Sequence, residues 1–175
     1  ADFPTTIGAY DTSYNDDGGG GGGGDAFVSK LNGDLTILLA STYLGGSADD
    51  FAHSLAINTN GSICVAGWTR STDFATTPDA YDTSFNGGMD AFISILNGDL
   101  TSLLASTYLG GAQDDNGEAI SIASSEEIYI VGRTSSTNFP TTSGAYDISH
   151  NGGYDIFISK LDSNLSDDAT PPTVN

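Results

Sequence analysis

Oxygen-bearing side chains recur at a fixed spacing in a glycine-containing loop near the middle of the chain, and this spacing predicts a cation site. Asp82, Ser84, Asn86 and Asp90 stand at relative positions 1, 3, 5 and 9, and the Gly88 carbonyl is available at position 7. Alternate residues of such a loop can point oxygens inward, and a glycine at position 6 allows the sharp turn. Calcium is the expected ion, because it prefers oxygen ligands.

The same spacing occurs twice more. In the later copy the ligand positions are occupied by Asp147, Ser149, Asn151, Gly153 and Asp155. The earlier copy keeps the front of the pattern, with Asp11, Ser13 and Asn15. A run of seven glycines follows there, and we expect this insertion to displace Asp25 from the ninth position, with Asp16 and Asp17 as substitutes. Isoleucine stands at the twelfth position of the two later loops, which excludes an EF-hand.

Each loop also has an interpretation that needs no metal. Asp82 and Asn86 are typical of Asx-turns, and the two glycines that follow suit the start of a strand. With two charges per loop, a calcium site would have weak to moderate affinity, appropriate to extracellular calcium. Two acidic pairs, Asp49–Asp50 and Asp114–Asp115, are open to the same choice. Turn capping is favoured for these pairs, because no further ligand recurs at a fixed offset from them.

The loops belong to a repeat of 65 residues. The segment DAF begins at Asp25 and again at Asp90, and STYLGG begins at Ser41 and again at Ser106. A constant period of this length indicates stacked copies of one supersecondary unit. The repeat module is expected over 1–165, in units of about 2–72, 73–137 and 138–165, and 166–175 is expected to be a linker. The chain begins inside a repeat, so we expect a mature or excised piece of a longer product.

Short runs of alternating apolar and small or polar residues predict strands rather than helices. The expected strands cover 25–32, 38–44, 54–57, 62–68, 90–97, 103–109, 119–123, 128–134 and 155–161. The segment NTNG at Asn58–Gly61 is a strong hairpin signal between two of them. Cys64 lies among apolar residues in one strand and is expected to be buried. The chain is therefore predicted to be all-β, with two, then four, then three strands in successive groups.

Several of these segments together resemble a known family. STDFATTPDAYDTSFNGGMDAFISILN, STYLGG, the paired aspartates and the hairpin are similar to the seven-bladed β-propeller repeat family of secreted and surface-anchored bacterial and archaeal proteins. The resemblance covers essentially residues 2–165. It implies β-propeller-type blades of four antiparallel strands and an extracellular or cell-surface location. It carries over no catalytic residues.

About two and a half blades are too few for a closed propeller, which needs about four to eight. We therefore expect the repeats to close or stack only with further repeats or other subunits. An unclosed end exposes backbone donors and acceptors that can pair with an edge strand of another chain. The expected partners are further copies of the chain, in a homo-oligomer or polymer formed through β-edges.

Charge and composition narrow the function. The formal net charge is −19, from 23 acidic and four basic residues, which argues against nucleic acid or an anionic membrane as a partner. No apolar run is long enough for membrane insertion. Two histidines offer little for catalysis, and the alignment of His53 with Glu118 is the nearest approach to an active site, so no enzymatic activity is expected.

The leading interpretation is an extracellular structural protein that assembles into a surface layer or filament and is stabilised by calcium. The alternative is a recognition β-propeller that binds carbohydrate or protein through its loops. Trp68, which could stack on a sugar ring, bears on that alternative, although a tryptophan beside a hairpin is more often part of a core or interface.

Overall fold

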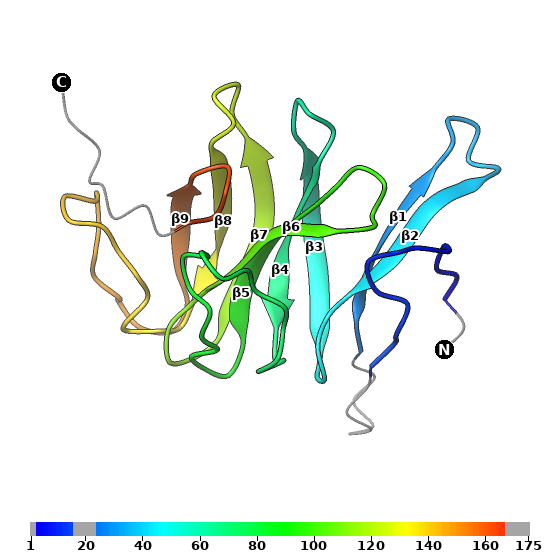
Figure 1. The fold of residues 1–175 in the computed structure, drawn as a ribbon. Coiled ribbons are helices and arrows are strands. Elements are labelled where there is room, and N and C mark those ends of the chain that lie inside the picture. The colour runs from blue at the N-terminus through cyan, green and yellow to red at the C-terminus, as the bar shows by residue number, and fades with distance from the viewer. Residues whose placement is uncertain (1–2, 16–23, 167–175) are drawn as a thin grey trace.

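The described part of the chain forms three separate antiparallel β-sheets. The structure, a computed structural model, describes residues 3–15 and 24–166, and every regular element of that part is a strand. The sheets pack face to face in chain order, and within the described residues they do not close into a barrel (Figure 1). The all-β prediction is confirmed. No helix in the described ranges is long and apolar enough to cross a membrane.

Counted over residues 3–15 and 24–166, the three sheets contain two, four and three strands, as predicted. The N-terminal sheet is formed by β1 (Ala26–Leu31) and β2 (Leu38–Leu44). The central sheet has the order β3 (Asp50–Ile57), β4 (Ile63–Thr69), β5 (Asp90–Leu96) and β6 (Leu103–Leu109). The C-terminal sheet has the order β7 (Asp115–Ile122), β8 (Ile128–Thr134) and β9 (Asp155–Leu161). Three parts of the sequence interpretation lie outside the described residues. They are the pair Asp16 and Asp17, the glycine run before Gly24, and the expected linker after Ser166.

The sheets are out of phase with the repeat units drawn from the sequence. The unit 73–137 supplies β5 and β6 to the central sheet, whereas its β7 and β8 belong to the C-terminal sheet. Each β5–β6-type hairpin follows the polar loop, and each β3–β4-type hairpin follows STYLGG and the acidic pair. The four-stranded sheet therefore combines the second half of one unit, β3 and β4, with the first half of the next unit, β5 and β6.

Two strands are longer than predicted. β3 begins at Asp50 and β7 at Asp115, each four residues before the expected start. The pairing register shifts at His53 in β3 and at Glu118 in β7, which marks a β-bulge at equivalent places. A bulge adds one residue and reverses the alternation of faces, so the pattern before it no longer matches the pattern after it.

Among the described residues the core consists of two apolar clusters, one on each face of the central sheet. Phe92 and Leu96 belong to the cluster shared with the N-terminal sheet, and Ile93 and Ile95 belong to the one shared with the C-terminal sheet. All seven residues of β5 are buried, because a neighbouring sheet covers each face. Cys64 is buried in the second cluster, as predicted, and burial raises the pKa of its thiol to about 11.

Candidate cation site

All three polar loops are closed by the same pair of aspartate hydrogen bonds. In the first of these, the backbone N–H of Ser13, Ser84 or Ser149 donates to Asp11, Asp82 or Asp147 at 2.7, 2.8 and 2.8 Å. In the second, the backbone N–H of Asn15, Asn86 or Asn151 donates to Asp25, Asp90 or Asp155 at 2.9, 2.7 and 2.7 Å. The first bond is the Asx-turn of the metal-free interpretation, formed by Asp82 and its equivalents, whereas the second bond runs to an aspartate later in the chain and is not an Asx-turn.

The glycine insertion does not disrupt the first loop. Asp25 accepts the N–H of Asn15 just as Asp90 accepts that of Asn86, with the same oxygen, Oδ2. The expected displacement of Asp25 is therefore wrong. Substitution by Asp16 or Asp17 concerns residues outside the described ranges.

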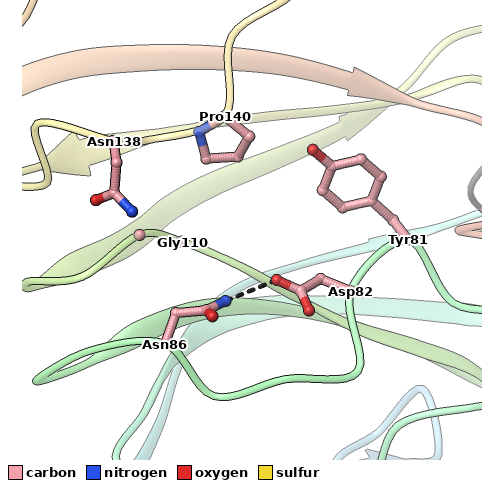
Figure 2. A pocket seen from close by; sticks show the side chains of 7 residues that line it. Tyr81, Asp82, Asn86, Gly110, Asn138 and Pro140 are labelled. Atoms are coloured by element: carbon pink, nitrogen blue, oxygen red, sulfur yellow. Dashed lines mark hydrogen bonds between the residues drawn. The ribbon is translucent and has the colours of Figure 1, made fainter.

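The amide of Asn86 lies inside the middle loop with its nitrogen toward the carboxylate. Its Nδ2 donates to Asp82 Oδ2 at 2.7 Å and to the Ser84 carbonyl at 3.0 Å, as Figure 2 shows for the first of these bonds. Both partners are acceptors, so the orientation of the amide follows from them. The predicted ligands Asp82, Ser84 and Asn86 thus come together, but an amide donor occupies the space between their oxygens. Gly88 lies beside Asp114, since a Cβ added there would overlap Asp114 Oδ1.

A different pair of carboxylates converges next to this loop, and the sequence pattern did not reveal it. Asp90 begins β5, Asp115 begins β7, and both have 0% exposure. A Cβ added to Gly110 would lie 2.7 Å from Asp90 Oδ1 and 3.0 Å from Asp115 Oδ2, so both carboxylates approach one point. Only glycine fits there. The equivalent pair, Asp25 and Asp50, converges in the same way on Gly45, where a Cβ would overlap Asp25 Oδ1 and lie 2.7 Å from Asp50 Oδ2.

The second aspartate of each acidic pair also caps the preceding turn, as the favoured interpretation expected. Asp115 Oδ2 accepts the N–H of Gly111 at 2.6 Å and the hydroxyl of Ser136 at 2.8 Å. Asp50 Oδ2 accepts equivalent bonds from Gly46 and Ser71 at 2.7 and 2.9 Å. Capping therefore uses one oxygen of each carboxylate and leaves the other for a further partner.

The first carboxylate of each convergent pair carries a buried oxygen that is short of partners. Oδ1 of Asp90 and Oδ1 of Asp25 accept no hydrogen bond from the described residues. Burial, followed by the charges of Asp115 and Asp82, raises the pKa of Asp90 to about 7 against the lowering effect of the Asn86 N–H. Burial is also the main cause that raises the pKa of Asp25 to about 6, and the charge of Asp50 adds to it.

No basic side chain neutralises these pairs. Arg70 pairs with Asp49, Arg133 with Glu118 and Lys160 with Glu127, while Lys30 donates to the Gly98 carbonyl. The four basic residues are thus engaged elsewhere. A cation is the kind of ligand that would satisfy a buried, unpartnered carboxylate oxygen.

An open hollow of about 410 Å³ lies beside the middle pair. Its lining is Tyr81, Asp82, Asn86, Gly110, Gly111, Asn138 and Pro140 (Figure 2). In the described part of the chain, no group of three or more His, Cys, Asp or Glu side chains is arranged to hold a metal ion. A cation at Gly110 would therefore have to take the rest of its ligands from carbonyl or amide oxygens and from water.

The structure also brings together His53 and Glu118, which occupy equivalent positions in the repeat. His53 Nδ1 lies 3.5 Å from Glu118 Oε2 and 3.2 Å from the Gly117 carbonyl, and Arg133 Nε lies 3.3 Å from Glu118 Oε1. These residues form a partly exposed ionic cluster between β3, β7 and β8.

Trp68 stacks on Phe51 across the β3–β4 ladder, with ring centroids 4.5 Å apart.

Among known proteins, no family model matches the chain and no curated protein matches it.

Proposed function

We propose that this chain is an extracellular structural repeat protein, a surface-layer or filament subunit, in which the sheets are propeller-type blades stabilised by calcium. The observation that carries the proposal is the central sheet. It is a four-stranded sheet covered on both faces by sheets of the same repeat that have two and three strands within the described residues. A unit that buries both faces against copies of itself serves to build an array, and it needs no active site to do so.

The incomplete sheets provide edges for association with other copies. In the central sheet β5 pairs with β4 on one side and β6 on the other. Its repeat equivalents have fewer partners among the described strands, because β1 pairs with β2 alone and β9 with β8 alone. A strand from another copy that pairs with either edge would satisfy these backbone groups.

Calcium fits the proposal through the carboxylate pairs rather than through the loop ligands alone. Asp90 supplies an oxygen that accepts no hydrogen bond from the described residues, Asp115 lies opposite it across Gly110, and Asp82 borders the adjacent hollow. A bound divalent ion would offset the mutual repulsion of these carboxylates and the cost of burying them. Isothermal titration with calcium after treatment with EGTA tests this part, together with thermal melting in both conditions. Unchanged melting and no heat of binding would remove calcium from the proposal.

Assembly is tested on the purified chain by electron microscopy and by hydrogen exchange read by mass spectrometry. We expect rings or filaments, and we expect amides of 26–31 and 155–161 to become more protected on assembly. Monomers at every concentration would refute the structural role. Assemblies without added protection in these strands would refute the edge contact and leave self-assembly in place.

The hollow beside Gly110 favours carbohydrate recognition as a second candidate. Its lining combines an aromatic ring, Tyr81, with the side-chain amides of Asn86 and Asn138, a combination that suits the apolar face and the hydroxyls of a sugar. A glycan array probed with the wild type and with Asn138→Ala tests this function. Binding that the variant loses would support recognition, and an array without a bound glycan would reject it.

A further inference from the structure

The two end sheets expose repeat positions that are buried elsewhere in the molecule. The N-terminal sheet and its turn expose Phe27, Leu31 and Leu35, with 53%, 45% and 74% of their surface accessible. Their equivalents one repeat later, Phe92, Leu96 and Leu100, each have 0% exposure. One repeat further on, the equivalents Phe157, Leu161 and Leu165 have 6%, 9% and 0%. We name Phe27, Leu31 and Leu35 the leading face.

The C-terminal sheet exposes the complementary positions on its outer side. Ile156 and Ile158 are 79% and 76% exposed, whereas their equivalents in the central sheet, Ala91 and Ile93, have 0% exposure. In the N-terminal sheet the equivalent of Ile158 is Val28, which is 5% exposed. We name Ile156 and Ile158 the trailing face.

Inside the chain, trailing positions pack on leading positions at both sheet junctions. Val28 shares a cluster with Phe92, Leu96 and Leu100 at the first junction. At the second junction, Ile93 shares a cluster with Phe157, Leu161 and Leu165. The trailing face of the last sheet and the leading face of the first sheet are therefore the two halves of a contact that the molecule already makes twice.

The turn of the leading face has the same backbone conformation as the two turns that make this contact inside the chain. Leu35 has a φ of 57°, in the left-handed region that a leucine rarely adopts. Leu100 and Leu165 share this conformation, with φ of 57° and 54°, and both side chains are fully buried against the preceding sheet. Burial compensates the strain at those two positions. Leu35 carries the same strain without the burial.

We infer that the leading face is covered by the trailing face of a second copy of this chain, so that copies stack head to tail, sheet on sheet. This inference rests on the proposed self-assembly, but it assigns the contact to sheet faces rather than to strand edges. Each copy presents one face of each kind, so the contact is heterologous and forms a ring if the rotation closes and a filament if it does not.

Three single variants separate this contact from others. Phe27→Lys blocks the leading face and Ile158→Lys blocks the trailing face, both at exposed positions. Leu39→Lys is the matched control, because Leu39 and its equivalent Leu104 are both 51% exposed, so no junction buries this position. Sedimentation velocity over a concentration series measures assembly, and circular dichroism verifies the fold of each variant.

We expect the wild type and Leu39→Lys to assemble, and the two blocked variants to remain monomeric when alone. An equimolar mixture of the blocked variants has one intact face of each kind, so it should yield a dimer and nothing larger. If Phe27→Lys fails to fold, Leu35→Asn replaces it. Asparagine tolerates the left-handed conformation, so it should raise the melting temperature of the monomer while it weakens association at least tenfold.

Two results would overturn the inference in distinguishable ways. If the blocked variants assemble like the wild type, the face contact is wrong and association through edges remains. If the wild type assembles but the mixture of the two blocked variants stays monomeric, the face contact is also wrong and association through edges remains. If the wild type is monomeric even at millimolar concentration, the proposed self-assembly is wrong as well, and the faces belong to another partner or to further repeats.

Discussion

Replacement of Asp90 by asparagine tests the carboxylate pair at Gly110 with little change in shape. The asparagine Oδ1 can still accept the N–H of Asn86, which lies 2.7 Å from the present Oδ2. Its Nδ2 takes the place of an oxygen that accepts no hydrogen bond from the described residues. The main change is the loss of a buried negative charge that faces Asp115.

The size of the effect follows from the pKa of Asp90. Burial and the neighbouring carboxylates raise this pKa from 3.8 to about 7. One pKa unit corresponds to about 1.4 kcal/mol, so the charged form costs at most roughly 4 kcal/mol in the folded state. Screening by water in the open hollow, and an amide N–H without an acceptor, reduce the gain. We expect Asp90→Asn to be more stable than the wild type by about 1–2 kcal/mol at pH 8 without calcium.

The sign of the pH dependence is opposite to that of a salt-bridged aspartate. The folded protein holds a proton on Asp90 up to about pH 7, whereas the unfolded chain releases it near pH 4. The favourable contribution of protonated Asp90 is therefore complete below pH 4 and is lost as the pH rises toward 7. Asp25, with a pKa of about 6, adds to the same trend. The advantage of Asp90→Asn should vanish at pH 4.

Urea unfolding at pH 4, 6 and 8 in EGTA, followed by Trp68 fluorescence, measures these differences. With an m-value of about 2 kcal/mol per molar urea, the expected shift of the midpoint at pH 8 is about 0.5–1 M. Calcium should stabilise the wild type more than the variant, which keeps the Asp25–Asp50 pair but has lost the pair at Gly110. Asp155→Asn is the matched control, since Asp155 accepts the same bond from Asn151 but faces no second carboxylate in the described repeat. A variant that is less stable than the wild type at pH 8 would refute this reasoning.

Three further predictions concern the close contact at Gly110 and the burial of Phe92 and Cys64. Gly110→Ala should destabilise the fold by about 2 kcal/mol or more in chemical denaturation, because its Cβ would overlap the two carboxylates, whereas Gly33→Ala, with no atom within 4 Å, should cost less than 1 kcal/mol. Phe92→Ala should cost roughly 3–5 kcal/mol, and the equivalent Phe27→Ala should cost the monomer far less, which paired unfolding curves would show. The Cys64 thiol should react with a maleimide at pH 8 only after denaturant is added, because it is buried and its pKa is raised to about 11.

The head-to-tail contact also bears on the acidic surface. A chain with a net charge of −19 repels its own copies at low ionic strength. Apolar faces such as Phe27 and Ile158 must overcome this repulsion to associate, and both salt and divalent ions would weaken it. Assembly should therefore increase with ionic strength, the opposite of what attraction between charged patches would produce.

The local sequence by itself determined the strands and the turns of this protein. Alternation of side chains has a period of two and needs no distant contact, so the predicted ranges for β2, β6, β8 and β9 agree with the observed ones. The 65-residue repeat likewise indicated how many strands each group contains. Prediction failed at the starts of β3 and β7, because the bulges at His53 and Glu118 reverse the alternation there.

Tertiary structure alone decided which carboxylates meet and which apolar residues are covered. Asp90 and Asp115 are 25 positions apart and begin strands of different sheets, so their approach at Gly110 depends on how those sheets stack. Phe27 and Phe92 have the same neighbours in sequence, DA before and a β-branched residue after, yet one is half exposed and the other fully buried. Burial is set by the sheet that lies opposite, and a repeated sequence carries no mark of whether its neighbour is present.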